Sequence, residues 1–390
     1  MENKKIYCDH IAAKPLLPEV IEAVNDCQKN IYGNPSSLHD FGQAAKKKLD
    51  EARSQIATLI SAQPEEIIFT ASGSEANSLA LKGIANAYAN KGKHIVTSVI
   101  EHFSVLHPLK ALEKEGFKIT QIPVDKNGLV DLSKLKEAIT NETILVSIML
   151  AHSEVGTIEP IKEINKIVKE KNKNAILHTD AISAVGNIPV SVTDLGIDAL
   201  SFSGNQFCGP LGAAGLFLRK GVRLIPQIEG GIQESGKRAG TENLPAIVGL
   251  GKAAEVARND LSVRAEKLTN LSKKLINGLK EKIDNIYPTG DTENRLPGHA
   301  SFCVEFIEGE GMLLFLNAEG IAVASGSACT SLALKASHVL LAMGVDAALA
   351  QGSIVFSLGI ENTEEDIDYI IEKFQPIIKR LREMSPLYNK

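Results

Sequence analysis

Three short segments carry side chains suited to binding a flat, anionic ligand. Residues 71–77, Ala-Ser-Gly-Ser-Glu-Ala-Asn, follow an apolar run and lead into a helical pattern, where small residues and free N–H groups favour an anion. Asp180 follows a second apolar run and could hold a ring nitrogen protonated. His102 follows a third and could stack on a ring. Each feature alone is more commonly structural: a helix cap, a hydrogen-bonded aspartate, a hydrogen-bonded histidine.

The cysteines indicate one candidate functional residue rather than a disulfide framework. The five cysteines are scattered, odd in number and form no C-x-x-C pair, so neither a disulfide scaffold nor a zinc site is expected. Cys27 and Cys303 are interpreted as buried packing thiols. Cys329 lies in Ser-Gly-Ser-Ala-Cys-Thr-Ser, whose small polar residues suit a thiol that moves between sites. Cys208 is a lesser candidate, with packing as its more ordinary role.

The elements that must position these residues alternate between apolar runs and helical patterns. Five short apolar runs indicate buried strands: 67–69, 95–97, 144–148, 175–177 and 199–202. Helical periodicity fills segments between them, as in 75–88 and 161–171. This alternation predicts an α/β fold whose mainly parallel sheet is covered by helices on both faces. In such sheets ligands bind beyond the carboxyl ends of the strands, where the three segments lie.

The C-terminal third predicts a smaller α+β domain. A charged, leucine-spaced stretch over 253–283 indicates a connecting helix, followed by strands near 299–306, 321–324 and 353–358. Residues 363–366, Thr-Glu-Glu-Asp, resemble a capping box that opens a final helix. We therefore expect a large domain over 14–254 and a small domain formed by 1–13 with 255–390.

Composition excludes several function classes. The 390-residue chain is 44% hydrophobic and 23% charged, with a net charge of −5 and no long basic run, so nucleic acid is not an expected partner. No apolar stretch approaches the roughly 20 residues of a membrane span. The first residues show no apolar signal region, so a cytoplasmic protein is expected.

Taken together and in this order, the motifs resemble the NifS/IscS cysteine desulfurases, in the class V aminotransferase group of the fold-type I pyridoxal phosphate enzymes. The resemblance covers nearly the whole chain. It rests on Gly-Asn-Pro-Ser-Ser-Leu-His at 33–39, Glu-Val-Gly-Thr at 154–157, Ser-Phe-Ser-Gly at 201–204, Arg-Ala-Gly-Thr at 238–241 and the Cys329 motif at 325–331.

The resemblance implies a role for each matching residue. Gly73 and Ser74 match the phosphate-binding turn, with Ser203 beside them. Asp180 matches the aspartate under the pyridine nitrogen, and His102 matches the histidine stacked on the ring. Thr241 matches a threonine that reaches the phosphate of the partner subunit, which implies a homodimer. Cys329 matches the cysteine that forms a persulfide.

The chain departs from the family pattern at the residue that matters most. The family motif Ser-Phe-Ser-Gly-His-Lys ends in Asn205 and Gln206 here, so the lysine that bonds to the cofactor is replaced by an amide. An amide cannot form an imine or act as a base on the substrate. Two other lysines, Lys14 and Lys237, could substitute only by swinging into the pocket from elsewhere.

Further departures fall in the same predicted pocket. Val355 stands where the family has an arginine that would hold the substrate carboxylate. His152 replaces an asparagine, and Ser183 replaces a glutamine. A trapping mutant would change the lysine alone, so these combined changes favour natural loss of the usual chemistry.

The sequence therefore predicts a cysteine desulfurase-like protein of iron–sulfur cluster assembly, without normal imine-based desulfuration. Cys329 would carry sulfur, or ligate an iron–sulfur cluster shared with an IscU-like scaffold. Pyridoxal phosphate would be held, if at all, without a lysine imine. The alternatives are an active desulfurase with non-covalently held pyridoxal phosphate, a different pyridoxal phosphate activity on another substrate, and a structural pseudoenzyme.

Overall fold

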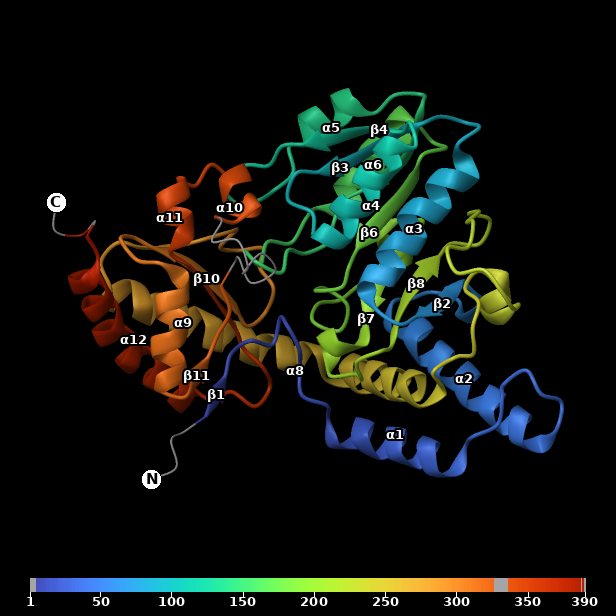
Figure 1. The fold of residues 1–390 in the computed structure, drawn as a ribbon, viewed down its shortest axis with the longest axis horizontal. Coiled ribbons are helices and arrows are strands. Elements are labelled where there is room, and N and C mark those ends of the chain that lie inside the picture. The colour runs from blue at the N-terminus through green and yellow to red at the C-terminus, as the bar shows by residue number, and fades with distance from the viewer. Residues whose placement is uncertain (1–4, 326–335, 387, 389–390) are drawn as a thin grey trace.

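A seven-stranded sheet forms the centre of the larger part of the protein (Figure 1). The computed structural model describes residues 5–325, 336–386 and 388. The strand order is β2-β8-β7-β6-β5-β3-β4, and β8 alone runs antiparallel to its neighbours. The strands are β2 (Ile67–Thr70), β3 (His94–Ser98), β4 (Lys118–Ile122), β5 (Thr143–Ser147), β6 (Ile176–Asp180), β7 (Ala199–Ser203) and β8 (Ala214–Leu218). The five predicted strands and the mainly parallel α/β sheet are confirmed.

Helices cover both faces of this sheet because its strands are apolar on both sides. Ile68 packs in one core with α3 and α4, whereas Ile67 and Phe69 pack in the opposite core with α2, α6 and the first part of α8. The helices are α1 (Pro18–Asn30), α2 (Asp40–Leu59), α3 (Gly73–Tyr88), α4 (Phe103–Lys114), α5 (Leu132–Ala138), α6 (Ile161–Lys171), α7 (Val192–Leu195) and α8 (Leu244–Lys282). Short 3-10 turns η1 (Pro64–Glu66), η2 (Gly204–Phe207) and η3 (Gln233–Gly236) interrupt the loops.

Helix α8 joins one core of the large sheet to a separate core in the C-terminal part of the chain. It is 39 residues long and begins at Leu244 rather than near residue 253, with a proline in its first turn, where the missing N–H costs nothing. Residues from Leu244 to Ala257 pack in the core of the large sheet, and residues from Leu268 to Leu279 pack in a separate core. The sequence prediction missed the start because that first segment is apolar on several sides rather than amphipathic.

The separate core at the C-terminal end of α8 packs against a smaller sheet. Strands β12, β10 and β9 form an antiparallel sheet in that order, and β1 from the chain start pairs in parallel with β11. The elements are β1 (Ile6–Tyr7), β9 (Ile286–Pro288), β10 (His299–Val304), α9 (Gly309–Ala318), β11 (Ile321–Ala322), α10 (His338–Ala342), α11 (Ala347–Gln351), β12 (Ser353–Ser357) and α12 (Glu364–Met384). Thr363 and Asp366 form the predicted capping box. The α+β content is confirmed, whereas the domain boundary at residue 254 stays a prediction.

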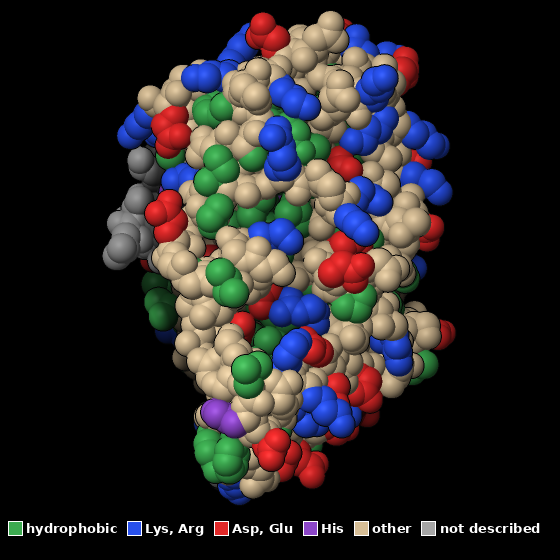
Figure 2. Space-filling model, turned by 90° about the vertical axis from the view of Figure 1, so that its right-hand side faces the viewer, with side chains coloured by type: hydrophobic (Ala, Val, Ile, Leu, Met, Phe, Trp, Pro, Cys, Tyr) green, Lys and Arg blue, Asp and Glu red, His purple; other side chains and the backbone are tan. Residues whose placement is uncertain are grey.

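The surface is mixed in charge. Figure 2 shows lysine, arginine and carboxylate side chains interspersed on one face, with small apolar groups between them. No helix in the described part of the chain is long and apolar enough to cross a membrane.

Candidate active site

The loops after five strands meet at one edge of the large sheet and enclose a cavity of about 280 Å³, the Asp180 cavity. Its lining includes residues from the predicted site: Gly73, Ser74, His102, Asp180, Ser203 and Gln206. They come together because β2, β3, β6 and β7 run parallel, so that their carboxyl ends share an edge. These predicted residues thus lie together, whereas Thr241 does not line the cavity.

The start of α3 supplies backbone donors to this cavity. Ser72 caps the helix by accepting a 3.1 Å hydrogen bond from the backbone N–H of Glu75. A Cβ on Gly73 would lie 2.3 Å from Ile182 Cδ1, so a larger residue would require the Ile182 side chain to move. Exposed Ser74 follows on the first turn. An anion at this position would meet free N–H groups and the positive end of the helix.

Asp180 is buried and oriented by two donors. The side-chain amide of Asn77 donates to Asp180 Oδ2 at 2.7 Å, and the backbone N–H of Ile182 donates to Oδ1 at 2.9 Å. Burial raises the pKa of Asp180 above its ordinary value. A buried carboxylate needs a cationic partner to remain charged, and a protonated ring nitrogen would provide one.

His102 has a defined tautomer. It caps α4, and its Nδ1 accepts a 3.0 Å hydrogen bond from the backbone N–H of Ser104. The proton of the neutral ring must therefore lie on Nε2. The imidazole lines the Asp180 cavity and a second cavity described below, so it lies at their junction.

Gln206 lies in η2, directly after β7, and a hydrogen bond fixes its side chain. Its Nε2 donates a 2.7 Å hydrogen bond to the backbone carbonyl of Ile11, while its buried Oε1 has no hydrogen-bond partner among the described residues. The neighbouring Asn205 accepts from the hydroxyl of Ser203 at 2.6 Å and donates to the carbonyl of Ala12 at 3.3 Å. Both amides thus anchor the N-terminal segment across the cavity.

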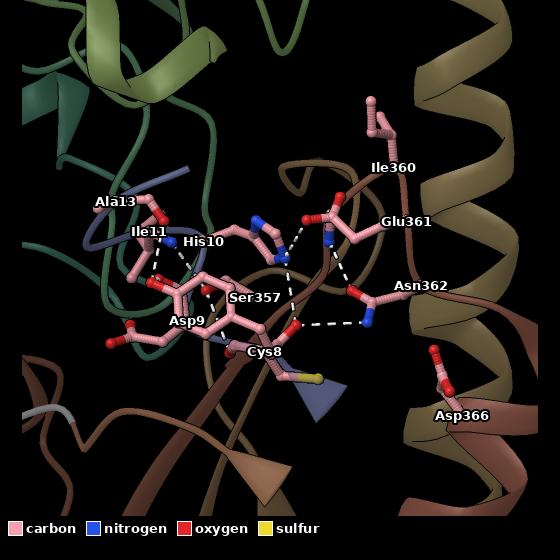
Figure 3. Close-up of polar contacts among 12 residues, drawn as sticks. Cys8, Asp9, His10, Ile11, Ala13, Ser357, Ile360, Glu361, Asn362 and Asp366 are labelled. Atoms are coloured by element: carbon pink, nitrogen blue, oxygen red, sulfur yellow. Dashed lines mark hydrogen bonds and ion pairs between the residues drawn. The ribbon is translucent and has the colours of Figure 1, made fainter. Parts of the chain in front are cut away.

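That N-terminal segment is itself fixed by polar contacts (Figure 3). The hydroxyl of Tyr7 donates to the carbonyls of Asp9 and Ala13, at 2.8 and 3.0 Å. The backbone N–H of Ile11 donates to Ser357 Oγ at 2.9 Å. The carbonyl that Gln206 binds is therefore part of a braced turn.

Neither of the two lysines considered as substitutes, Lys14 and Lys237, lines the cavities of the site. Lys14 is bound at 2.5 Å to Asn187 Oδ1, and the amide of Asn187 donates to the backbone carbonyl of Gln206 at 3.1 Å. Burial lowers the pKa of Lys14 to about 8. Lys14 lies behind Gln206 and lines neither cavity, and Lys237 at the end of η3 lines neither as well.

A second cavity of about 450 Å³, the Val355 cavity, adjoins the first. The two share Ile11, His102, Ser153 and Gln206 in their linings. Val355 of β12 lines it, 3% exposed, where the family motif has an arginine. His152 is buried there, its Nε2 bonded to the carbonyl of Ile100 at 2.8 Å, and burial lowers its pKa to about 4, so the ring is neutral.

Sequence reasoning missed the carboxyl groups of the Val355 cavity as site residues. Asp9, Glu101 and Glu154 all line it. The available signal was positional: Glu101 precedes His102, and Glu154 lies in the quoted Glu-Val-Gly-Thr motif. Only the fold places Asp9, from the chain start, beside them.

The predicted residue Thr241 lines neither cavity. Thr241 is exposed. Its loop is tied to α3 within the chain, because Arg238 Nε lies 2.8 Å from Glu75 Oε1. Its approach to a partner subunit stays a prediction. Cys329 lies outside the described residues. Cys208 is buried and lines neither cavity, and burial raises the pKa of its thiol, as expected of a packing residue.

Comparison with known proteins decides the family. The Aminotransferase class-V model matches residues 6–370. The chain is 47% identical to the cysteine desulfurase IscS of Dictyoglomus turgidum over 98% of this chain and 97% of that one, and 46% identical to that of Methanosarcina thermophila over 100% and 96%. The chain belongs to the class-V aminotransferase family, among the IscS/NifS cysteine desulfurases.

Solved structures of this family share the fold. A NifS-like protein matches with a TM-score of 0.92 at 38% identity, covering 97% of this chain and 100% of that one. The apo cysteine desulfurase of Thermococcus onnurineus matches with a TM-score of 0.87 at 27% identity, covering 97% and 96%. Membership of this IscS/NifS family implies a pyridoxal phosphate cofactor.

The described residues fit the non-covalent part of that cofactor. The start of α3 suits its phosphate, and buried Asp180 suits its pyridine nitrogen. Among the described residues the covalent part does not fit, because Gln206 stands at the end of β7 and neither Lys14 nor Lys237 lines the cavity.

Proposed function

We propose that this IscS/NifS family member handles sulfur in iron–sulfur cluster assembly through Cys329, without normal imine-based desulfuration. The observation that carries the proposal is the position of Gln206, whose amide is bonded to Ile11 at the strand end where the family motif has lysine. It is supported by the names of the relatives, cysteine desulfurase IscS.

Pyridoxal phosphate, if held, would be held by Ser72, Gly73 and Ser74 at its phosphate, by Asp180 at its ring nitrogen and by His102 against its ring. When bound, this cofactor supplies an electron sink for carbanions on a substrate. Neither Gln206 nor neutral His152 offers a basic amine to move a proton from substrate carbon. Val355 offers nothing to a substrate carboxylate.

The chemistry proposed for Cys329 needs no lysine. Its thiolate would attack the outer sulfur of a persulfide donor, R–S–S⁻, forming a Cys329 persulfide and releasing the donor thiolate. The same thiolate could ligate iron in a cluster shared with an IscU-like scaffold, since thiolates are the usual ligands of such clusters. We expect the protein in the cytoplasm.

A homodimer is part of the proposal. Large apolar side chains are exposed near the site and on adjoining loops, including Leu211 of the Asp180 cavity lining, Ile232 beside η3, and Leu38 between α1 and α2. Exposed apolar groups of this size favour burial by a partner. We expect Thr241 of one subunit to reach the Asp180 cavity of the other. Light scattering should give twice the chain mass, and Thr241→Ala should weaken retention of pyridoxal phosphate.

The test compares Cys329→Ser with Cys208→Ser. Each protein is incubated with a protein persulfide, and sulfur uptake is followed by mass spectrometry. Cluster retention is followed by visible absorption of the complex with an IscU-like scaffold. Cys329→Ser should abolish both with folding unchanged, and Cys208→Ser should retain both. Sulfur uptake and cluster retention at the parent level by Cys329→Ser would reject the proposal in favour of a structural pseudoenzyme.

The alternative, an active desulfurase with non-covalently held cofactor, draws on the intact Asp180 cavity. Turnover of cysteine to alanine by the parent protein, supplied with pyridoxal phosphate, would establish it.

A further inference from the structure

Asn77 is a fully buried amide on α3, the helix whose start lines the Asp180 cavity. It follows Gly73 by four residues, so the two lie on the same side of the helix. Asn77 itself does not line the cavity, and sequence reasoning assigned it no role. A buried side-chain amide is costly unless its N–H groups are bonded, so the partners of Asn77 indicate what it does.

Both N–H groups of Asn77 Nδ2 are used, and each is bonded to a different part of the site. One donates to Asp180 Oδ2 at 2.7 Å, and the other donates to Ser104 Oγ at 2.8 Å. The partners belong to separate elements, since Asp180 ends β6 and Ser104 lies in the first turn of α4. A single amide therefore links the carboxyl end of a sheet strand to the start of a helix.

The link continues from Ser104 to His102. Ser104 Oγ lies 2.7 Å from His102 Nδ1. Because this ring nitrogen accepts from the backbone N–H of Ser104 and carries no proton, the hydroxyl must be the donor in that contact. The hydroxyl of Ser104 thus accepts from Asn77 and donates to His102, whose own proton lies on Nε2.

We propose that Asn77 is a positioning residue of the pyridoxal phosphate site, which orients Asp180 directly and His102 by way of Ser104. Asp180 and His102 are the residues that would meet the cofactor at its ring nitrogen and at its ring face. This role rests on the non-covalent cofactor site proposed above and is independent of sulfur handling by Cys329.

The amide of Asn77 also affects the charge that Asp180 can hold. Burial raises the pKa of Asp180, whereas the hydrogen bonds from Ile182 and Asn77 lower it. An ionised carboxylate accepts hydrogen bonds and cannot donate one, so the N–H group of Asn77 favours the ionised form. That form would pair with a protonated ring nitrogen, and loss of Asn77 should therefore weaken the pairing.

The experiment is isothermal titration of the full-length protein with two ligands that differ only at the ring nitrogen. They are pyridoxal phosphate and deazapyridoxal phosphate, in which a C–H group replaces that nitrogen. The parent should bind pyridoxal phosphate more tightly. Asn77→Leu should reduce this preference about tenfold or more, the loss expected for a hydrogen bond to a charged group.

A purely structural role of Asn77 would weaken the binding of both ligands equally, and that result would overturn the proposal. A parent that shows no preference for the ring nitrogen, or that binds neither ligand, would overturn it as well. Sulfur uptake by Cys329 would be unaffected in either case, so failure here is distinct from failure of the sulfur-handling proposal.

Three matched substitutions separate this role from a general loss of packing. Thr97→Val is the control, because the Thr97 hydroxyl is also fully buried and donates a 2.9 Å hydrogen bond to the carbonyl of Ser147, but Thr97 lines neither cavity. It should leave the preference for the ring nitrogen unchanged. Ser104→Ala should reduce the preference, since one N–H group of Asn77 loses its acceptor, and Ser104→Thr should retain it. If Asn77→Leu does not fold, a parental preference in Ser104→Ala would refute the proposal.

Nuclear magnetic resonance of the histidine rings tests the His102 end of the link without cofactor. The parent ring should carry its proton on Nε2. Asn77→Leu and Ser104→Ala should both shift the Nδ1 resonance of His102, whereas Thr97→Val should not. An unchanged Nδ1 resonance in Asn77→Leu would refute the link from Asn77 to His102.

Discussion

The side-chain amide of Gln206 donates a 2.7 Å hydrogen bond to the backbone carbonyl of Ile11, 195 residues away in sequence. The contact joins the end of β7 to a segment that Tyr7 and Ser357 brace from the other side. The hydrogen bond therefore fixes the Gln206 side chain against the N-terminal segment.

Gln206→Lys should improve retention of pyridoxal phosphate but restore little cysteine turnover. The new amine can bond to the cofactor, yet Val355 leaves the substrate carboxylate unheld, a loss of roughly ten- to a hundredfold in affinity. Cofactor retention is measured by absorbance after desalting, and turnover by alanine release. High turnover from this single substitution would show that the other pocket changes matter little.

In the parent protein, borohydride reduction in the presence of pyridoxal phosphate should label no lysine. Lys14 is the residue to watch, because its buried amine has a pKa lowered to about 8 and lies next to Asn187, which also contacts Gln206. Peptide mass analysis identifies any lysine that carries a pyridoxyl group. A pyridoxyl group on Lys14 or Lys237 would contradict the proposed loss of imine chemistry.

A thiol reagent should label Cys329 alone in the native protein. Cys8, Cys27, Cys208 and Cys303 are buried, and burial raises the pKa of each thiol, to about 12 for Cys8 and Cys303. Since the thiolate is the reactive form, these four should react only after unfolding. The ratio of native to denatured labelling is the measurement, and fast native labelling of Cys208 would reopen it as a candidate.

Glu234→Gln should lower the free energy of unfolding by about 3–5 kcal/mol, the usual cost of breaking a buried pair. Both carboxylate oxygens of Glu234 bind Arg53, at 2.8 and 2.7 Å, and one also accepts from the backbone N–H of Phe69. Glu137→Gln, which removes an exposed pair with Lys134, should have no measurable effect in the same urea titration. Similar losses of unfolding free energy for both variants would mean that the buried pair stabilises the fold no more than the exposed pair does.

The stability gained by Glu159→Gln should grow as pH rises from about 4.5 to 8. Burial raises the pKa of Glu159 from 4.5 to about 8 in the folded protein. In that interval the unfolded state releases the proton and the folded state keeps it, so parent stability falls with pH by up to about 1.4 kcal/mol per unit from this group. Urea titrations of both proteins at four pH values measure their free energies of unfolding. A difference between the two that does not change with pH would contradict this prediction.

The sequence by itself determined the elements and the family. Strands such as β6 and helices such as α6 follow from apolar periodicity, and Thr363 with Asp366 capped α12 as predicted. The candidate site was also readable in part, because Gly73, His102 and Asp180 each follow a strand, and parallel strands bring those ends to one edge. Gln206 was recognisable because its motif is contiguous.

Only the tertiary structure decided what surrounds those residues. The antiparallel direction of β8, the early start of α8, the contact of Gln206 with Ile11 and the link from Lys14 through Asn187 all depend on partners distant in sequence. The residues that line the Val355 cavity likewise come from separate segments, with Asp9 near the chain start and Val355 near its end. Local periodicity records which face of an element is buried, but it contains no information on which distant side chain that face will meet.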